Sequence, residues 1–450
     1  MSSTGGFNIG LTALIAHRQT LDVIGQNLAN VNTEGYSRQR VNLKPDAGPI
    51  SPAVFSIYDG TGSGVRINGI TRLRDEFLEA RAHQEFAYDS QLNRTKELID
   101  GVETTFSEPT DNGLGALLGD FIGSWSSLAN APGELASRSQ VVERGETLAA
   151  AIRNQDSNLQ GQRRATTDQL SNQISQINLK TRQFSALNDR VRSAQADGDA
   201  ANELRDQRDQ LAVELAQALG ARFVTSAEGA VDVYLGAQVL VRSESAEALK
   251  VTTEPGTGNV SVNFVTNGSA ASVGGAALAS IQGINEVIPR YRNELAAIAT
   301  KLADEVNAVH TASYDRSGNP GQAFFTFGSN GIIMNPVVRN DPNKVAASAI
   351  PGGNLDGTAA REISRKTGAQ KLYGDTVVRV AVEAQAASRR VDVQANVMKQ
   401  IENARDSTSG VNVDEEMANL LATQRAYEAA ARFISVLDEV LDTLVNRLVR

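Results

Sequence analysis

The chain contains three histidines, the side chains that most often bind transition metals or transfer protons near neutral pH. His17, His83 and His310 lie far apart in the sequence. A zinc site needs three or four converging ligands, and the 450 residues include no cysteine to complete one. His17 also falls on the apolar face of a predicted helix, so the pattern favours packed or surface histidines. We therefore expect no metal site.

Two loops have compositions that could bind a ligand. The sequence 314-YDRSGNPGQAFF-325 begins like a calcium turn but lacks the further acidic residues and the final Glu that such a loop requires. The sequence 59-DGTGSGV-65 has no Lys and no clean strand before it, so it does not fit a phosphate-binding loop. The many acidic residues fall on predicted helix faces, where they are usually solvated. The sequence thus predicts no catalytic residue and no cofactor.

The overall composition argues against several classes of protein. Hydrophobic residues make up 41% and charged residues 21%, as in globular domains, and the 5% of aromatic residues favours helical packing over a large β-sandwich. The net charge of −9 does not suit a nucleic-acid-binding surface. The sequence contains no run of 18 apolar residues, so we expect no transmembrane helix. No cleavable signal peptide is expected, because the first ten residues lack a basic region followed by an apolar one.

The two ends of the chain carry matching apolar repeats. Their spacings of three and four residues are typical of one face of a coiled-coil helix. The N-terminal seam consists of Leu14, Leu21, Ile24, Leu28 and Val31, with His17 at one of the positions between them. The C-terminal seam consists of Leu420, Tyr427, Ile434, Leu437, Leu441, Leu444 and Leu448. Asn412 and Glu415 are placed as a capping box at the start of the second helix, and Glu416 suits the positive end of its dipole.

Between the two ends the periodicity is helical, with a short β interval. We expect a mainly α protein with a small β-rich module, long terminal helices, a helical-bundle body and discontinuous domains. The expected parts are an N-terminal helix, turn and strand region, a helical body, a β-rich outer module, a returning helix with loops and short strands, and a C-terminal helical region that pairs with the first part. Their expected limits are 1–85, 86–221, 222–277, 278–374 and 375–450.

The stretch 28-LANVNTEGYSRQRV-41 ends the first predicted helix abruptly. Asn30 and Asn32 can end a helix, because asparagine side chains bond nearby backbone groups and tolerate left-handed geometry. Gly35 supplies any positive φ that the turn needs. The turn motif comprises Asn30, Asn32, Thr33, Gly35 and Tyr36, and a strand of mixed charge follows it. Because no catalytic residue type lies here beyond one Glu, the stretch indicates a role in assembly.

This stretch resembles the N-terminal signature of the bacterial flagellar axial proteins, which are the rod, hook and hook-associated proteins. The pattern L-A-N-x-N-T-x-G-aromatic belongs to that family, and the continuation Tyr36–Gln39 is similar to the hook-associated members of the hook–filament junction. Segments 116–132, 286–310 and 409–446 resemble the same members, in the same order along the chain. The resemblance therefore spans nearly the whole sequence.

The resemblance implies a mechanical role. In this family the terminal helices pair as an antiparallel coiled coil and line the inner tube of a helical assembly. The two seams would then pack together, with Leu14, Leu21, Ile24 and Leu28 against Ile434, Leu437, Leu441 and Leu444. The chain would be a structural subunit of the flagellum that forms the hook–filament junction and allows the filament to assemble, and not an enzyme.

The resemblance also implies partners and a location. The expected partners are further copies of the chain in a helical ring, the hook protein, the second junction protein and a cytoplasmic export chaperone, with no nucleic acid and no membrane insertion. The chain would leave the cell through the flagellar type III apparatus and act outside it. Two alternatives stay open: another axial protein of the hook or rod, and a secreted cell-wall hydrolase with axial-protein termini. A cluster of catalytic side chains in one cleft would favour the hydrolase.

Overall fold

The computed structural model describes residues 3–46, 62–106, 113–226, 229–352 and 355–447. The chain divides into two compact units, each built from separate stretches of sequence. Unit 1 contains residues 1–86, 178–247 and 396–450, and unit 2 contains residues 87–177 and 248–395. Three of the four divisions fall inside long helices, α2 (Glu76–Thr105), α4 (Leu135–Ala196) and α10 (Gly368–Ser409), and the fourth falls between residues 247 and 248.

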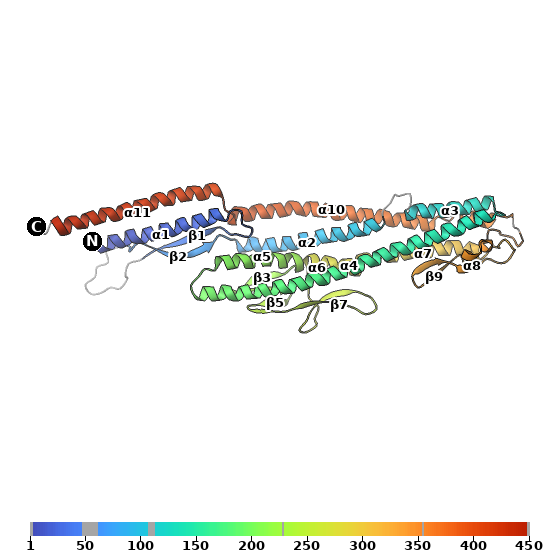
Figure 1. The fold of residues 1–450 in the computed structure, drawn as a ribbon, viewed down its shortest axis with the longest axis horizontal. Coiled ribbons are helices and arrows are strands. Elements are labelled where there is room, and N and C mark those ends of the chain that lie inside the picture. The colour runs from blue at the N-terminus through green and yellow to red at the C-terminus, as the bar shows by residue number, and fades with distance from the viewer. Residues whose placement is uncertain (1–2, 47–61, 107–112, 227–228, 353–354, 448–450) are drawn as a thin grey trace. The chain divides into compact units, whose positions relative to one another are not determined.

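Unit 1 brings the two ends of the chain together with two small sheets (Figure 1). Besides its parts of the three long helices, it contains α1 (Ser3–Ala29), α5 (Asn202–Leu219) and α11 (Val413–Arg447). The first sheet is the antiparallel pair β1 (Gln39–Pro45) and β2 (Val65–Arg72). The second is antiparallel in the order β3 (Arg222–Thr225), β4 (Val231–Leu235), β5 (Gln238–Arg242) and β6 (Ser245–Ala246).

Unit 2 is a helical body with two hairpins. Its own helices are α3 (Leu114–Asn130), α6 (Gly275–Gln282), α7 (Ile288–His310), α8 (Pro336–Asn340) and α9 (Thr358–Ile363). A π-helical turn at Gly283–Val287 joins α6 to α7, and a 3₁₀ turn covers Pro342–Lys344. The hairpins are β7 (Leu249–Thr253) with β8 (Val260–Phe264), and β9 (Phe325–Gly328) with β10 (Gly331–Met334). The predicted mainly α fold with long terminal helices and little sheet is thus confirmed.

The strands within 222–277 form two separate sheets rather than one module. Strands β3–β6 belong to unit 1 and strands β7–β8 to unit 2. Each sheet has its own polar anchor. In unit 1, Asn188 of α4 donates to the backbone oxygens of Val231 and Ser243 at 2.9 and 3.0 Å. In unit 2, Asn285 exchanges two 2.8 Å hydrogen bonds with the backbone of Val260. The other expected domain limits stay predictions.

The core of unit 2 is built around aromatic side chains from distant parts of the sequence. Trp125 and Phe121 of α3, Tyr291 of α7 and Phe324 are fully buried. The centre of the Trp125 ring lies 6.2 Å from that of Phe121, edge-on, and 5.3 Å from that of Phe324. Fully burying a large apolar side chain contributes about 1.5–3 kcal/mol. Two helical segments that the sequence pattern singled out therefore meet in one core.

Gly321 lies against the end of α7, where no side chain fits. A Cβ at this position would overlap the backbone oxygen of His310 and lie 2.7 Å from the Cβ of Ala346. We expect Gly321→Ala to lower the free energy of unfolding of unit 2 by about 3 kcal/mol, since the backbone must move. Thermal denaturation followed by circular dichroism measures this change. Gly374→Ala in α10 is the control, because its Cβ meets nothing within 4 Å. Equal melting of the two variants would contradict the packing described.

Candidate functional site: the paired terminal helices

Helices α1 and α11 lie side by side and run in opposite directions (Figure 1). Two glycines of α1 let the helices approach closely. The Cδ1 atom of Leu437 lies 3.2 Å from the place that a Cβ of Gly6 would occupy. Ile434 covers Gly10 in the same way, with its Cγ1 atom 2.6 Å from the corresponding place. The antiparallel pairing of the terminal helices is therefore present within one chain.

The register of this pair differs from the expected one. At the other end of α1, the Nδ2 atom of Asn27 donates to the carboxylate of Glu416 at 3.0 Å. Leu28 thus lies at the level of Glu416, whereas the N-terminal seam was expected against the segment from Ile434 to Leu444, which begins eighteen residues or about 27 Å further along α11. The expected register is wrong because a heptad pattern specifies which face is buried, but not how far one helix slides along the other.

Most seam residues nevertheless lie on the faces that the pairing covers. Ile24 is buried, and the half-buried seam residues are Leu14, Leu21, Leu28, Leu420, Ile434, Leu437 and Leu441. Tyr427 is 36% exposed. Val31 lies beyond the end of α1 and is exposed, so the helical seam ends at Leu28. The side chain of Leu444 and all of Leu448 lie outside the described residues.

The turn after α1 is built as its residue types predict. The helix ends at Ala29, and Asn30 bonds back to the preceding turn through its Nδ2 atom, 3.0 Å from the backbone oxygen of Gln26. Thr33 donates through its backbone N–H to the oxygen of Asn30 at 3.0 Å and through its hydroxyl to the Asn30 side chain at 3.1 Å. Gly35 has φ +80°, which only glycine adopts without strain. The neighbouring Asn32 is exposed.

Asn27 is the centre of a buried polar network that joins the turn to α11. Its side chain is 1% exposed and uses its full hydrogen-bonding capacity. The Oδ1 atom accepts from the Tyr36 hydroxyl at 2.9 Å and from the Gln39 N–H at 3.0 Å. The Nδ2 atom donates to the Gln39 oxygen and to Glu416, each at 3.0 Å. Burial, with the nearby carboxylates of Asp206 and Glu416, raises the pKa of Tyr36 to about 12, so the hydroxyl stays a donor.

Arg38 completes the link between the motif and the C-terminal helix. Its Nε atom donates to Glu416 at 2.8 Å, and a second guanidinium nitrogen lies 2.6 Å from the same oxygen. A third bond of 2.9 Å reaches the exposed carboxylate of Glu415. The backbone N–H of Arg38 also donates to the oxygen of Ser409 at 2.9 Å. The turn motif is therefore tied to the first turn of α11 by charge-assisted bonds, which are about twice as strong as neutral ones.

Sequence reasoning missed this network as a site. The predicted capping box is half confirmed: the Asn412 side chain accepts from the N–H groups of Asp414 and Glu415 at 2.9 and 3.3 Å. Glu415 itself bonds to Arg38. The signal that could have revealed the network is Asn27, a polar residue beside apolar seam positions. Such a residue inside a helical interface usually has a specific buried partner.

His310 and the loop 314–325 have structural roles. His310 is fully buried; its Nδ1 atom donates to the Gln322 oxygen at 2.5 Å, and its Nε2 atom accepts from the Ala346 N–H at 2.9 Å. In the loop 314–325, Asp315 accepts from the N–H groups of Ser317 and Asn319 at 2.8 and 2.9 Å, as in an ordinary turn.

Residues 59–61 of the glycine-rich run lie outside the described residues, and β2 begins at Val65, the last residue of that run. Residues 3–46, 62–106, 113–226, 229–352 and 355–447 contain no group of three or more side chains able to hold a metal ion. In those same ranges, no helix has the length and apolar character needed to span a membrane.

The stability of unit 2 should depend on pH through His310. Burial lowers the pKa of this imidazole to about 4, although its bond to Gln322 opposes the shift. Between pH 6.5 and pH 4 the unfolded chain therefore binds a proton that the folded chain excludes. We expect the free energy of unfolding to fall by up to about 3 kcal/mol as pH falls through this window.

Thermal denaturation from pH 7 to pH 4 tests this dependence on pH. His310→Gln should melt lower at pH 7 and show a shallower dependence on pH, whereas His17→Gln on α1 should keep the dependence of the original chain. Parallel pH profiles for the original chain and His310→Gln would show that His310 is not the titrating group.

The paired helices also carry apolar side chains on faces that the pairing leaves uncovered. On α1 the exposed members are Phe7, Ile9, Leu11 and Ile15. On α11 they are Met417, Leu421, Val436 and Val440. Exposed apolar stripes of this extent usually mark an interaction surface. The arrangement can bind another helix, and among the described residues it brings no catalytic groups together.

Comparison with known proteins places the chain in one family. Residues 99–325 match the model of the flagellar hook-associated protein FlgK helical domain. Residues 7–36 match the flagella basal body rod protein model, and residues 403–448 match the flagellar basal body rod FlgEFG protein C-terminal model. The helical body and both terminal helices are therefore covered by flagellar families.

Complete relatives match over almost their full length. The flagellar hook-associated protein 1 of Bacillus subtilis is 26% identical over an alignment of 503 residues, which covers 98% of this chain and 97% of the relative. The protein of the same name from Salmonella typhimurium is 23% identical, covering 98% of this chain and 99% of the relative.

A solved structure supports the fold. The flagellar hook junction protein FlgK from Burkholderia pseudomallei aligns with a TM-score of 0.50 and 24% sequence identity, over 55% of this chain and 47% of that chain. The FlgK model alone spans half of the present sequence. The chain therefore belongs to the FlgK family of flagellar hook-associated proteins and is a structural protein of the bacterial flagellum.

Proposed function

We propose that the chain forms the junction between the hook and the filament of a flagellum and allows the filament to assemble on it. The observation that carries this proposal is the match of 98% of the chain to relatives named flagellar hook-associated protein 1. The match includes the turn motif and both terminal helices, which are the parts through which an axial protein would contact its neighbours.

The proposed mechanism depends on the paired helices as an assembly element. Copies of the chain associate into a helical ring by burying the uncovered apolar faces of α1 and α11. Phe7, Leu11 and Ile15 recur every fourth residue and are 41–54% exposed, and Val436 and Val440 are 57% and 49% exposed. Fully burying one such side chain is worth about 1.5–3 kcal/mol. A few of these contacts per subunit are enough to offset the entropy lost when a copy joins the ring.

The specific partners follow from this position in the flagellum. One side of the ring contacts the hook protein, and the other contacts the second junction protein, below the filament. Before assembly, the apolar stripe of α11 needs a cover in the cytoplasm, and an export chaperone supplies it. The chain leaves the cell through the flagellar type III apparatus and acts outside the cell. It has no catalytic activity, in keeping with His310 and Asp315, whose side chains are occupied by structural hydrogen bonds.

Deletion of the gene tests the proposed function. We expect electron microscopy to show hooks without filaments and the culture medium to contain unassembled flagellin. Expression of the full chain should restore filaments, whereas a chain truncated before α11 should not. Normal filaments in the deletion strain, or hooks missing altogether, would place the chain elsewhere in the flagellum.

A further inference from the structure

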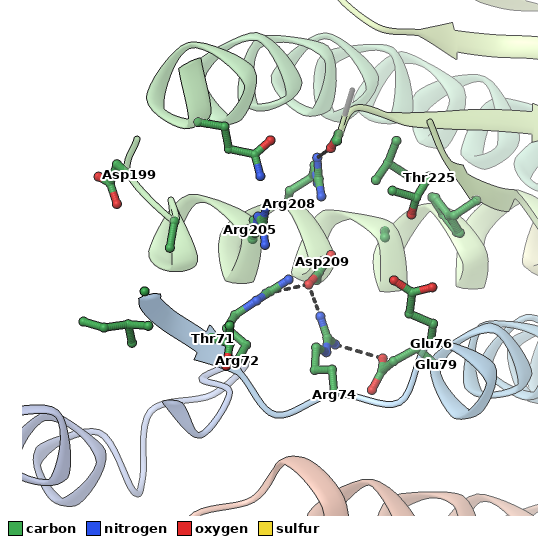
Figure 2. A pocket seen from close by; sticks show the side chains of 18 of the residues that line it. Thr71, Arg72, Arg74, Glu76, Glu79, Asp199, Arg205, Arg208, Asp209 and Thr225 are labelled. Atoms are coloured by element: carbon green, nitrogen blue, oxygen red, sulfur yellow. Dashed lines mark hydrogen bonds and ion pairs between the residues drawn. The ribbon is translucent and has the colours of Figure 1, made fainter. Parts of the chain in front are cut away.

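Unit 1 contains a cavity of about 1160 Å³ that the assembly role does not use. It lies among β2, the start of α2, the loop before α5, the first turns of α5, and β3 (Figure 2). One part of its wall is formed by Phe184 and Phe223, and the His83 ring packs against Phe223 in a tilted arrangement with 4.7 Å between ring centres. The opposite part carries four arginines, Arg72, Arg74, Arg205 and Arg208.

Two of these arginines are neutralised by carboxylates of the chain. Arg72 lies 2.5 Å from an oxygen of Asp206 and 2.8 Å from one of Asp209. Arg74 pairs with Asp209 and, at 2.8 Å, with Glu79 (Figure 2). Their charges are therefore balanced inside the protein. Neither arginine therefore carries an unbalanced charge that would attract a further anion.

The other two arginines have no carboxylate partner among the described residues. Arg208 is only 5% exposed, and its guanidinium donates to neutral acceptors, the Asn188 side chain at 3.0 Å and the Gly229 oxygen at 3.1 Å. Arg205, one helical turn earlier on the same face of α5, lines the cavity, and its side chain forms no hydrogen bond or ion pair within the described chain. Two positive charges thus meet in a partly enclosed space without a counterion.

Unsatisfied buried nitrogens lie in the same wall. Within the described chain, the buried Nε atoms of Arg74 and Arg208 and the buried Nε2 atom of His83 have no hydrogen-bond partner. Buried polar groups in folded proteins are nearly always bonded to protein, water or an ion. The guanidinium groups also repel one another: burial and the charges of Arg72, Arg205 and Arg74 lower the pKa of Arg208 to about 10.

The remaining carboxylates of the wall do not supply the missing negative charge. Glu76 is exposed, and Asp199 is exposed and accepts from the backbone N–H of Ala201 at 3.0 Å. Ala201 is also the N-cap of α5, and it provides no side-chain hydrogen bond to the helix. The positive end of the α5 dipole therefore adds to the potential around Arg205.

We propose that this cavity binds a small tetrahedral oxyanion of the phosphate or sulfate class, held by the guanidinium groups of Arg205 and Arg208. Planar guanidinium groups match such oxyanions because two N–H donors can bond two oxygens at once. The bound anion supplies the missing counter-charge where β2, α2 and α5 meet. It thereby stabilises the part of unit 1 that supports the turn motif. This role is separate from assembly, so the absence of anion binding would leave the proposed function unaffected.

Calorimetric titration of the purified full chain with sodium phosphate, at constant ionic strength set by sodium chloride, tests the proposal. We expect one saturable site per chain, and a rise in melting temperature at saturating phosphate. Arg205→Gln should weaken phosphate binding by about tenfold or more while leaving the fold intact, because Arg205 has no partner to lose. Arg192→Gln is the matched control, since it removes the same charge from a surface ion pair with Asp189 and Glu244.

The possible results are distinct. Saturable phosphate binding that is lost in Arg205→Gln and kept in Arg192→Gln supports the site. Absence of saturable binding overturns it, as does an equal loss in both variants, which would indicate general charge screening. Tighter binding of sodium acetate than of phosphate would overturn the assignment to a tetrahedral oxyanion.

Discussion

Replacing Leu437 with Asp is expected to abolish filament assembly while leaving the helical body of unit 2 folded. The Leu437 side chain is half-buried and covers Gly6 in the α1–α11 pair, with its Cδ1 atom 3.2 Å from the place of a Gly6 Cβ. Placing a carboxylate in such an apolar contact costs several kcal/mol unless the helix moves away. The pair would separate, and the surface that we assign to subunit association would be lost. Cells should export the variant, yet they should carry hooks without filaments in electron micrographs.

Ser435→Asp is the matched control for this experiment. It adds the same charge to the same helix, two residues away, at an exposed position. Its cost should be at most about 0.5 kcal/mol, as for most surface substitutions. Cells that carry it should swim and should have filaments of normal length. Loss of assembly in both variants would show that any added charge on α11 blocks assembly, and normal swimming of Leu437→Asp would refute the role of the pair.

The second large effect is expected for Glu416→Ala. Glu416 is 2% exposed and accepts hydrogen bonds from Asn27 and Arg38, so its removal leaves a partly buried guanidinium without its main counterion. Breaking a buried ion pair from one side typically costs about 3–5 kcal/mol. Chemical denaturation of the purified chain should show this loss in unit 1. Hydrogen exchange should show faster exchange in α1 and in the first turns of α11.

A double-mutant cycle separates the ion pair from other effects. Glu415→Ala removes the exposed partner of Arg38, with 60% of its side-chain surface exposed, and should cost about 0–1 kcal/mol. The combination of Arg38→Ala with Glu416→Ala should cost less than the sum of the two single changes, by about 1–3 kcal/mol. Additive costs would mean that Arg38 and Glu416 do not depend on each other.

Much of the fold could be predicted from the sequence because the helices follow strong local signals. The 62-residue helix α4 lies within the expected helical body, since its apolar positions recur with helical spacing and the sequence 130-NAPG-133 stops the previous helix. The turn after α1 also depends on local signals. Asn30 and Gly35 act through their own backbone geometry, which depends little on the rest of the chain.

The elements that escaped prediction depend on contacts between distant residues. The register of α11 against α1 is determined by Asn27 and Arg38, which bind Glu416. This residue lies nearly 400 positions away in the sequence, and no local pattern encodes such a pairing. The division of the β interval has a similar cause, because Asn188 and Asn285 anchor its two sheets separately. Apolar periodicity indicates which face is buried, but the polar bonds select the partner and the register.

Cysteine cross-linking of the assembled flagellum tests most directly whether the terminal helices pair within each subunit in the observed register. The chain has no native cysteine, so Gly10→Cys with Ile434→Cys allows only one disulfide within a chain. After mild oxidation of purified hook–filament particles, we predict a cross-link within one chain, seen as a monomer-sized band with altered mobility. The control pair, Gly10→Cys with Leu420→Cys, lies fourteen residues out of register and should not cross-link. A dimer-sized band, or cross-linking of the control pair alone, would contradict the pairing on which this account depends.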